Sequence, residues 1–263
     1  MSQAVTLVVI TKNAGNCLEK CLKSADWIEN KIIVDSGSTD RTVEIAKLAG
    51  AKVIHQDWLG FGPQKQFAVM QAPTDWVLCL DADEFLSPEL SQSLQSLFEQ
   101  KELLDAYKFP RSNKFLGRFL KHGEGYPDWS LRLFNKTKAR WSDDLVHEKV
   151  VAIGSGPLKV GKLGGDLMHE SGESITHYIE KQNCYTDIQA RQMIESGKNV
   201  SCSRLIFSPL MRFVKFYIVK RGFLDGLPGF VHIAIGCFAA FLKYLKVISN
   251  RQIQEGMKYG IRD

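Results

Sequence analysis

Short apolar runs alternate with amphipathic stretches over the first hundred residues of the chain. Four runs rich in β-branched residues predict buried strands: residues 5–10, 31–34, 51–55 and 75–80. Four further stretches have helical spacing or open on a capping residue or a proline, and they predict helices: residues 15–25, 38–50, 63–72 and 88–100. Strands and helices in this alternating order predict an α/β fold, with a mostly parallel sheet flanked by helices.

The pattern changes beyond residue 105. Three short β-like pieces follow: residues 107–110, 129–134 and 145–151. A helical pattern resumes at residues 174–196, and no repeat or low-complexity linker separates the parts. We therefore expect an α/β domain over residues 1–170 and a helical region over residues 171–263.

Composition and charge narrow the class of protein. The chain is 44% hydrophobic and 24% charged, which excludes a disordered chain and a polytopic membrane protein. Residues 201–263 hold ten Lys and Arg against three Asp and Glu, so the net charge of this part is +7 against +5 for the whole chain. A basic C-terminal part predicts contact with an anionic surface. The six cysteines form no CxxC motif, which favours free thiols in a reducing cytosol.

The C-terminal region combines this charge with apolar and aromatic residues. Seventeen uncharged residues lie between Asp225 and Lys243, and Pro228 interrupts their start. A membrane span needs about twenty apolar residues, so the run reads as too short. Residues 205–219 mix aromatic and aliphatic side chains with basic ones. This mixture predicts helices that lie on an anionic leaflet, and the alternatives are helices packed on the first domain or a dimer face.

Polar clusters follow three of the predicted strands: residues 11–13, 35–40 and 81–84. In a parallel sheet the carboxyl ends of the strands share one edge, where ligands bind. Asp81 and Asp83 are two carboxylates that follow a buried strand, so they need solvent, a partner or a cation. Oxygen ligands of this kind suit Mg²⁺ or Mn²⁺, which would also hold phosphates of a substrate. The alternative is a polar loop that caps a helix.

A glycine-rich helix start is the next candidate. Residues 60–66, GFGPQKQ, place glycines before a helix N-terminus and Lys65 in its first turn. Exposed amides at a helix start attract phosphate, and Lys65 adds a positive charge. A surface turn with a solvated lysine explains the same residues.

These segments resemble a known family. VTLVVITKN, IIVDSGSTDRT, GFGPQKQ and LDADE occur in the order seen in family 2 glycosyltransferases, which have the GT-A (Rossmann-like) fold, and the match covers about residues 4–150. YPDWSLRLF, LVHEKV and KRGFLDGLPGF resemble more narrowly the bacterial lipopolysaccharide-core β-glucosyltransferase group. The resemblance implies a donor part at about residues 1–105, an acceptor part at about 106–170 and a membrane-associating helical extension.

The resemblance also implies roles for single residues on the donor side. Asp35 would bind the nucleotide base, and its carboxylate can accept a hydrogen bond from the imide N–H of uracil, which cytosine lacks. The alternative is a turn carboxylate. The remaining donor-side roles are Thr11 and Asn13 in the base pocket, Lys65 at base or diphosphate, Asp81 near ribose or sugar, and Asp83 at metal and diphosphate.

On the acceptor side, Glu148 matches the family position of the carboxylate that takes a proton from the acceptor hydroxyl. Asp143 and Asp144 are rivals for that role. A structural alternative pairs Glu148 with Lys149 or with Arg132.

Two histidines and two further side chains complete the predicted site. His147 is expected on the acceptor side, where it fits a supporting or core histidine better than a base. His169 falls where many GT-A enzymes add a late metal ligand, with a structural histidine as the alternative. Trp129 and Arg132 are expected on the acceptor side, because a tryptophan face suits a sugar and an arginine suits phosphate. Trp129 also fits a plain core position.

Together these features predict an inverting, metal-dependent glycosyltransferase. The expected donor is a UDP-sugar, with glucose as the sugar, and the expected acceptor is a heptose of the lipopolysaccharide inner core. The expected place is the cytoplasmic face of the bacterial inner membrane, and nucleic acid is not an expected partner. The alternatives are a polyprenyl-phosphate or other polysaccharide acceptor, a nucleotidyltransferase, and a non-catalytic sugar-nucleotide binding module.

Overall fold

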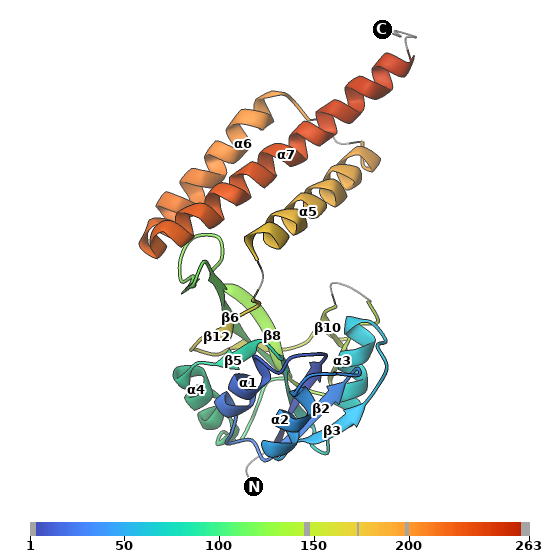
Figure 1. Cartoon of the computed structure of the whole chain (residues 1–263), viewed down its shortest axis with the longest axis vertical. Helices are drawn as coiled ribbons and strands as arrows, with labels where there is room; N and C mark the ends of the chain where they lie inside the picture. The colour runs from blue at the N-terminus through green and yellow to red at the C-terminus, as the bar shows by residue number, and fades with distance from the viewer. Residues whose placement is uncertain (1–3, 145–147, 173, 198–199, 259–263) are drawn as a thin grey trace. The chain divides into compact units, whose positions relative to one another are not determined.

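The computed structural model describes residues 4–144, 148–172, 174–197 and 200–258, without the side chains of 251–258. The chain forms two compact units (Figure 1). The sheet unit comprises residues 1–113 and 128–171, and the helical unit comprises residues 114–127 and 172–263. The helical unit therefore includes a segment, Lys114–Pro127, that comes from within the first part of the chain.

The sheet unit contains most of the strands and four helices. In chain order its elements are β1 (Val5–Thr11), α1 (Leu18–Ser24), β2 (Asn30–Asp35), α2 (Thr42–Leu48), β3 (Lys52–His55), α3 (Phe61–Met70), β4 (Trp76–Asp81), β5 (Glu84–Leu86), α4 (Pro88–Phe98), β6 (Ala106–Phe115, whose end lies in the helical unit), β8 (Asp128–Asn135), β9 (Ala139–Trp141), β10 (Val150–Ala152), β11 (Val160–Lys162) and β12 (Leu167–His169). The predicted α/β alternation over the first hundred residues is confirmed.

The main sheet has the strand order β3-β2-β1-β4-β8-β6-β12-β5. Strands β1 to β4 are parallel, β8 is antiparallel to both β4 and β6, and β12 is parallel to β6. Parallel strands in the order 3-2-1-4 are the first four positions of the doubly wound, Rossmann-like strand order. The fold class is therefore as predicted: α/β, mostly parallel at its N-terminal half.

Two cores cover the two faces of this sheet. One packs α1, α2 and α4 against the strands through side chains such as Leu22, Ala46 and Leu94. The other packs α3 and β9 through Ala68, Val69 and Trp141. With helices on both faces, the strand ends are where the sheet presents its polar groups.

One predicted strand is shorter than expected. The pattern over residues 145–151 predicts a β-like piece that includes Glu148, but β10 begins only at Val150. Residues 145–147, among them His147, lie outside the described residues. Glu148 therefore comes from the irregular segment that precedes β10, where its backbone is not held in a strand ladder.

The helical unit is built from α5 (Ile175–Glu195), α6 (Ser203–Phe213), the π-helical turn η1 (Val214–Val219), the 3₁₀ turn η2 (Gly222–Asp225), α7 (Gly226–Lys258) and the short strand β7 (Arg118–Phe119). Helix α7 packs along both α5 and α6 (Figure 1). Its buried side chains Ile233, Ala240 and Val247 are spaced by seven residues, which is the spacing of a helix–helix seam.

Asp225 joins the turn between α6 and α7 to the segment 114–127. Its carboxylate is 1% exposed and accepts hydrogen bonds from the N–H groups of Lys121 (3.0 Å) and His122 (2.8 Å). His122 Nδ1 lies 3.1 Å from the same side chain. A buried carboxylate needs such partners, so Asp225 fixes this segment onto the helical turn.

Helix α7 is longer than the apolar run suggested. Pro228 lies in its first turn, where a missing N–H and a fixed φ are tolerated, so it does not interrupt the helix. Within the described residues, the stretch Gly222–Asn250 is long and apolar enough to cross a membrane by length and composition alone. The expectation that the run is too short for a span therefore does not hold for the helix as folded.

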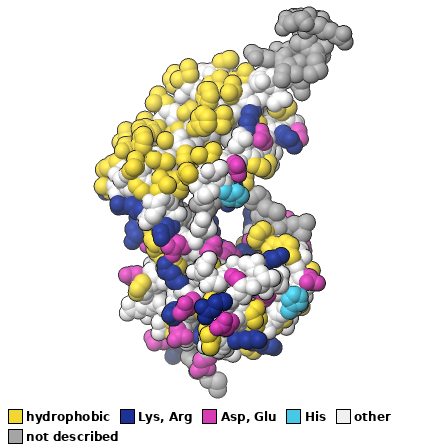
Figure 2. Space-filling view, viewed as in Figure 1, with side chains coloured by type: hydrophobic (Ala, Val, Ile, Leu, Met, Phe, Trp, Pro, Cys, Tyr) yellow, Lys and Arg dark blue, Asp and Glu magenta, His cyan; other side chains and the backbone are white. Residues whose placement is uncertain are grey.

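Helix α6 has an unusual surface, because none of its residues is buried. Ile206 is 70% exposed and Phe207 is 61% exposed, and Leu210 and Met211 continue the same face. Figure 2 shows hydrophobic side chains gathered over the helices of this unit, whereas charged and polar side chains intersperse those of the sheet unit. The helical unit thus turns part of its apolar surface outward.

Candidate functional site

The sheet brings the three predicted polar clusters to one edge. Thr11 at the end of β1 is the register partner of Asp35 at the end of β2. Asp81 at the end of β4 is the partner of Ile10 on the other side of β1. The apolar runs that precede these residues form the buried ladder, so the polar side chains emerge where the strands stop.

Asp35 is held by four hydrogen bonds. Its Oδ1 accepts from Thr11 Oγ1 (3.1 Å) and from Ser38 Oγ, and its Oδ2 accepts from the N–H groups of Gly37 (2.9 Å) and Ser38 (2.8 Å). Burial by itself raises the pKa of Asp35, but these bonds outweigh it and hold the pKa below its ordinary value. The four bonds use the lone-pair sites of the carboxylate. Asp35 can accept a further hydrogen bond from a ligand only if the hydroxyl of Thr11 or Ser38 turns away.

Asn13 connects the loops that follow β1 and β2. Its backbone is left-handed, with φ of 52°, a conformation that asparagine tolerates better than most residues. The side-chain Oδ1 accepts a hydrogen bond from the N–H of Thr39 (2.8 Å), and the Asn13 N–H donates to Ser38 Oγ (2.8 Å). Asn13 therefore shapes the edge beside Asp35.

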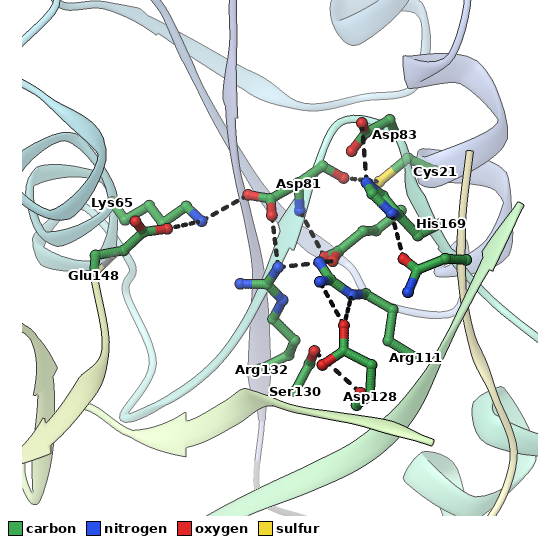
Figure 3. Close-up of polar contacts among 12 residues, drawn as sticks. Cys21, Lys65, Asp81, Asp83, Arg111, Asp128, Ser130, Arg132, Glu148 and His169 are labelled. Atoms are coloured by element: carbon green, nitrogen blue, oxygen red, sulfur yellow. Dashed lines mark hydrogen bonds and ion pairs between the residues drawn. The ribbon is translucent and has the colours of Figure 1, made fainter. Parts of the chain in front are cut away.

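Lys65 links Asp81 to Glu148, residues that lie far apart in the sequence (Figure 3). Its Nζ lies 2.8 Å from Asp81 Oδ1 and 2.7 Å from Glu148 Oε1. Lys65 is 6% exposed, and its Nζ also lies 4.9 Å from the centre of the Trp141 ring. Among the described residues the partner of Glu148 is Lys65, and neither Lys149 nor Arg132 takes that place.

A glycine in α3 permits this approach. A Cβ on Gly62 would lie 2.2 Å from the carbonyl oxygen of Ser142 and 2.5 Å from that of Asp144, so no larger residue fits. The Gly62 N–H instead donates to the Asp144 carbonyl (3.2 Å). The segment that leads to Glu148 is thereby held against the start of α3, one turn from Lys65.

Arg132 reaches the same cluster through a β-bulge. On β8, Leu133 pairs with Tyr107 and Leu131 pairs with Lys108, so Arg132 is the extra residue between them. One of its terminal nitrogens lies 2.6 Å from Asp81 Oδ2 (Figure 3), and the same nitrogen lies 2.7 Å from Glu84 Oε1. Arg132, expected on the acceptor side, thus pairs with Asp81, which was expected on the donor side, and with Glu84.

Burial and pairing set the charges of this cluster. Burial raises the pKa of Asp81, but Arg132 and Lys65 outweigh it and hold that pKa well below its ordinary value. Burial lowers the pKa of Arg132, but Asp81 and Glu84 outweigh it, so the guanidinium stays charged. Arg111 extends the network, with nitrogens 3.2 Å from Glu84 Oε1 and 2.6 Å from an Asp128 oxygen.

Asp83 and His169 meet at the neighbouring end of the sheet. His169 Nε2 lies 3.3 Å from Asp83 Oδ2 (Figure 3). His169 Nδ1 lies 2.7 Å from Asn113 Oδ1. Strand β12, which carries His169, pairs with both β5 and β6. A histidine whose second nitrogen is held by a neighbour is oriented as metal-ligating histidines are. Among the described residues, no group of three or more His, Cys, Asp or Glu side chains is placed to hold a metal.

The acceptor-side candidates lie apart from one another. Trp129 is 40% exposed on β8, and its ring is approached by the ammonium groups of Lys108 and Lys162. Asp143, a rival of Glu148, is bound by Arg140 at 3.0 Å on the surface. Asp144, the other rival, accepts from Ser142 Oγ and is exposed.

Several residues of the site were not assigned from the sequence: Glu84, Arg111, Asn113, Asp128 and Trp141. Arg111 and Asn113 lie two residues apart on β6, so their side chains share a face, and strand alternation was the available signal. Glu84 lies in the predicted cluster at residues 81–84 but received no role, and Trp141 gave no signal. Their partners Arg132 and Lys65 come from elements that only the folded sheet unit brings close to them.

Three comparisons relate this chain to known proteins. A family model described as Glycosyl transferase family 2 matches residues 6–153. An uncharacterized glycosyltransferase of Rickettsia typhi is 34% identical over 259 residues, covering 92% of this chain and 86% of the relative. The lipopolysaccharide core biosynthesis glycosyltransferase LpsC of Rhizobium meliloti is 30% identical over 253 residues, covering 94% and 92%. The crystal structure of S. aureus TarS 1–349 in complex with UDP has a TM-score of 0.44 and 14% identity, covering 95% and 92%.

Proposed function

Because this chain belongs to glycosyl transferase family 2, we propose that it is an inverting glycosyltransferase that moves a sugar from a UDP-sugar to a saccharide acceptor. Glucose is the proposed sugar, and a heptose of the lipopolysaccharide inner core is the proposed acceptor. The observation that carries the proposal is the position of Lys65, which joins Asp81 on the donor side to Glu148 on the opposite side. The name of the Rhizobium meliloti relative supports the acceptor class.

The donor nucleotide is proposed to bind along the ends of β1, β2 and β4. Thr11, Asn13 and Asp35 form the base-binding end, where the hydroxyl groups on Asp35 can rotate to admit the uracil N–H. Asp81 and Asp83 follow at the sugar and diphosphate end. This order agrees with the sheet, in which the ends of β2 and β4 flank the end of β1.

A divalent cation is proposed between Asp83 and the donor diphosphate, with His169 as a second protein ligand. Two protein ligands plus phosphate oxygens are how Mg²⁺ is often held, and imidazole also suits transition metals such as Mn²⁺. The residues present fit the group, because Asn113 fixes the His169 ring beside Asp83. When bound, the cation would offset negative charge on the departing diphosphate.

Glu148 is proposed as the general base. It would accept the proton of the acceptor hydroxyl as the new bond from that oxygen to the anomeric carbon forms and the bond from that carbon to UDP breaks. In the structure Lys65 holds Glu148 and Asp81 together. A diphosphate oxygen beside Asp81 would compete for the Lys65 ammonium, and Glu148 would then be free to meet the acceptor.

Attachment to the cytoplasmic face of the inner membrane is proposed for the helical unit. The exposed apolar face of α6 continues into η1 with Ile218 and Val219. Arg204, Lys215, Lys220 and Arg221 are exposed on the same segments. Apolar side chains beside basic ones suit the boundary between acyl chains and anionic headgroups. Helix α7 buries one stripe in the unit, so we propose surface attachment rather than a span.

A donor and acceptor panel tests the enzymatic proposal. Purified protein receives each UDP-sugar with extracted core acceptors of stepwise length, with Mg²⁺, Mn²⁺ or excess EDTA. We expect transfer from UDP-glucose to a heptose-bearing acceptor, a β-linked product by NMR and no transfer in EDTA. Transfer only to polyprenyl phosphate would select the alternative acceptor, and UDP binding without turnover on any acceptor would contradict the enzymatic proposal.

Fractionation tests the proposed location. We expect the protein in the membrane pellet and its partial release by high salt or alkali, because the attachment combines charge with shallow apolar burial. Release by detergent alone would indicate that α7 spans the bilayer, and a protein found wholly in the supernatant would contradict membrane attachment.

A further inference from the structure

Two lysines face each other directly in the sheet unit. Lys162 on β11 is the register partner of Lys108 on β6. Like charges in directly opposed positions of neighbouring strands destabilise a sheet. Among the described residues no ion pair forms at either ammonium, in contrast to Lys65, which is paired with Asp81 and Glu148. The sheet therefore keeps two uncompensated charges side by side.

Both ammonium groups converge on one exposed aromatic ring. The Nζ of Lys162 lies 4.8 Å from the centre of the Trp129 ring, and that of Lys108 lies 5.9 Å from it. The cation–π attraction holds the two side chains toward the ring. Trp129 is 40% exposed, so a ligand can reach the ring as well as the charges.

The location relates this group to the proposed acceptor side. Trp129 precedes Arg132 by three residues on β8, and Arg132 contacts Asp81. The rise of a strand puts the two backbone positions about 10 Å apart. The group therefore lies beyond the reacting atoms but within the reach of an acceptor longer than one sugar.

We propose that Lys108, Lys162 and Trp129 form a subsite for an anionic saccharide. The two ammonium groups bind its phosphate or carboxylate, and the ring packs against the C–H face of the adjacent sugar. The subsite rests on the proposed function only in its assignment to the acceptor. On this assignment the acceptor is a charged saccharide. The subsite binds a sugar unit of the acceptor other than the one that receives the new sugar.

Binding of small sugars tests the subsite without any donor. The indole N–H signal of Trp129, assigned with Trp129→Phe, is followed by NMR during titration with glucose, glucose 6-phosphate, glucuronate and inorganic phosphate. We expect glucose 6-phosphate to bind about tenfold or more tightly than glucose, because charge-assisted hydrogen bonds are added. Inorganic phosphate should bind more weakly than glucose 6-phosphate, and tighter binding of glucuronate than of glucose would identify a carboxylate as a second acceptable anion.

The double variant Lys108→Gln/Lys162→Gln should bind glucose 6-phosphate no better than glucose. Its unfolding temperature should stay the same or rise, because a repulsive pair is removed. Lys138→Gln, at another exposed lysine of the sheet unit, is the control and should bind like the wild type.

Equal affinity for glucose and glucose 6-phosphate, or an unchanged preference in the double variant, would overturn the subsite. Inorganic phosphate that binds as tightly as glucose 6-phosphate would reduce it to an adventitious anion contact. Turnover of UDP-glucose with a short acceptor, measured on the same variants, keeps this outcome separate from a failure of the proposed function. Such turnover should persist in the double variant even when the preference for charged sugars is lost.

Discussion

The two units of this protein use their hydrophobic residues in opposite directions. The sheet unit buries side chains on both faces, such as Leu7 on one face and Val8 on the other, and it keeps its interior charges in close pairs. The helical unit buries a single stripe of α7 and leaves α6 without one buried residue. The sheet unit thus has a complete hydrophobic core. The helical unit exposes an apolar surface, and contact of such a surface with water is unfavourable.

The difference separates chemistry from attachment. Each group proposed to handle the donor or the acceptor hydroxyl lies in the sheet unit, at the ends of strands or on segments packed against α3. The exposed apolar side chains of α6 and η1 in the helical unit include none of these groups. Substitutions in the sheet unit should therefore change turnover, and substitutions in the helical unit should change membrane binding.

The largest effect is expected at Asp83. Asp83→Asn removes the charge that is proposed to hold the cation and diphosphate, and metal sites of this kind supply several kcal/mol of transition-state stabilisation. We expect turnover to fall about ten-thousandfold with an unchanged circular dichroism spectrum. Asp57→Asn, at a carboxylate that is 94% exposed, is the matched control and should be active. Full activity of Asp83→Asn would remove this residue from the site.

Glu148→Gln should have the next largest effect. General-base catalysis is worth about a hundred- to ten-thousandfold, so we expect turnover to fall by about a thousandfold. The controls are Asp143→Asn and Asp144→Asn, which change the two nearby surface acids. If either control were inactive and Glu148→Gln were normal, the base would lie four or five residues earlier in the chain.

Arg132 tests the paired charges of the sheet unit. Removal of one partner from a buried pair costs about 3–5 kcal/mol, and we expect Arg132→Met to lie near the lower limit because Lys65 and Arg111 still compensate the two carboxylates. Arg140→Met, which breaks an exposed pair with Asp143, should cost less than about 1 kcal/mol. Urea unfolding measures both. Equal losses of unfolding free energy in the two variants would contradict the larger contribution assigned to the buried ion pairs of the sheet unit.

The smallest effect is expected on α6. Phe207→Glu should weaken binding to vesicles of anionic lipid by about tenfold or more, because one aromatic side chain leaves the bilayer and a charge of the wrong sign enters. Leu48→Glu is the control, since Leu48 is 78% exposed but stands on the sheet unit. Vesicle sedimentation measures binding, and turnover with a water-soluble acceptor should be the same for both variants. Equal vesicle binding by the two variants would contradict the division between the units.

Much of the sheet could be predicted from the sequence, because each strand is marked by residues that are adjacent in the chain. The runs that became β1, β2 and β4 are apolar and end in polar residues, so Thr11, Asp35 and Asp81 were expected at one edge before their register was known. Asn13 and Lys65 were likewise expected at this edge from motifs close in the sequence, and the structure places them beside Asp35 and Asp81.

The cross-strand part of the site could not be predicted in the same way. The partners of Arg132 depend on a bulge in β8, and a bulge leaves no mark in the hydrophobic pattern. The pairing of Lys65 with Glu148 depends on Gly62, whose missing Cβ lets two distant segments touch. The composition of the apolar run suggested that Pro228 interrupts it. The proline lies in the first turn of α7, where it does not break the helix, and this position was not visible in the composition.

We propose that one edge of the sheet unit divides into a donor side with Asp83 and an acceptor side with Glu148. Calorimetric titration of UDP with Mn²⁺ into the wild type, Asp83→Asn and Glu148→Gln separates the two sides. We expect binding to the wild type that is lost in excess EDTA, loss of this binding in Asp83→Asn, and nearly unchanged binding in Glu148→Gln. Binding that survives in Asp83→Asn but disappears in Glu148→Gln would contradict the division.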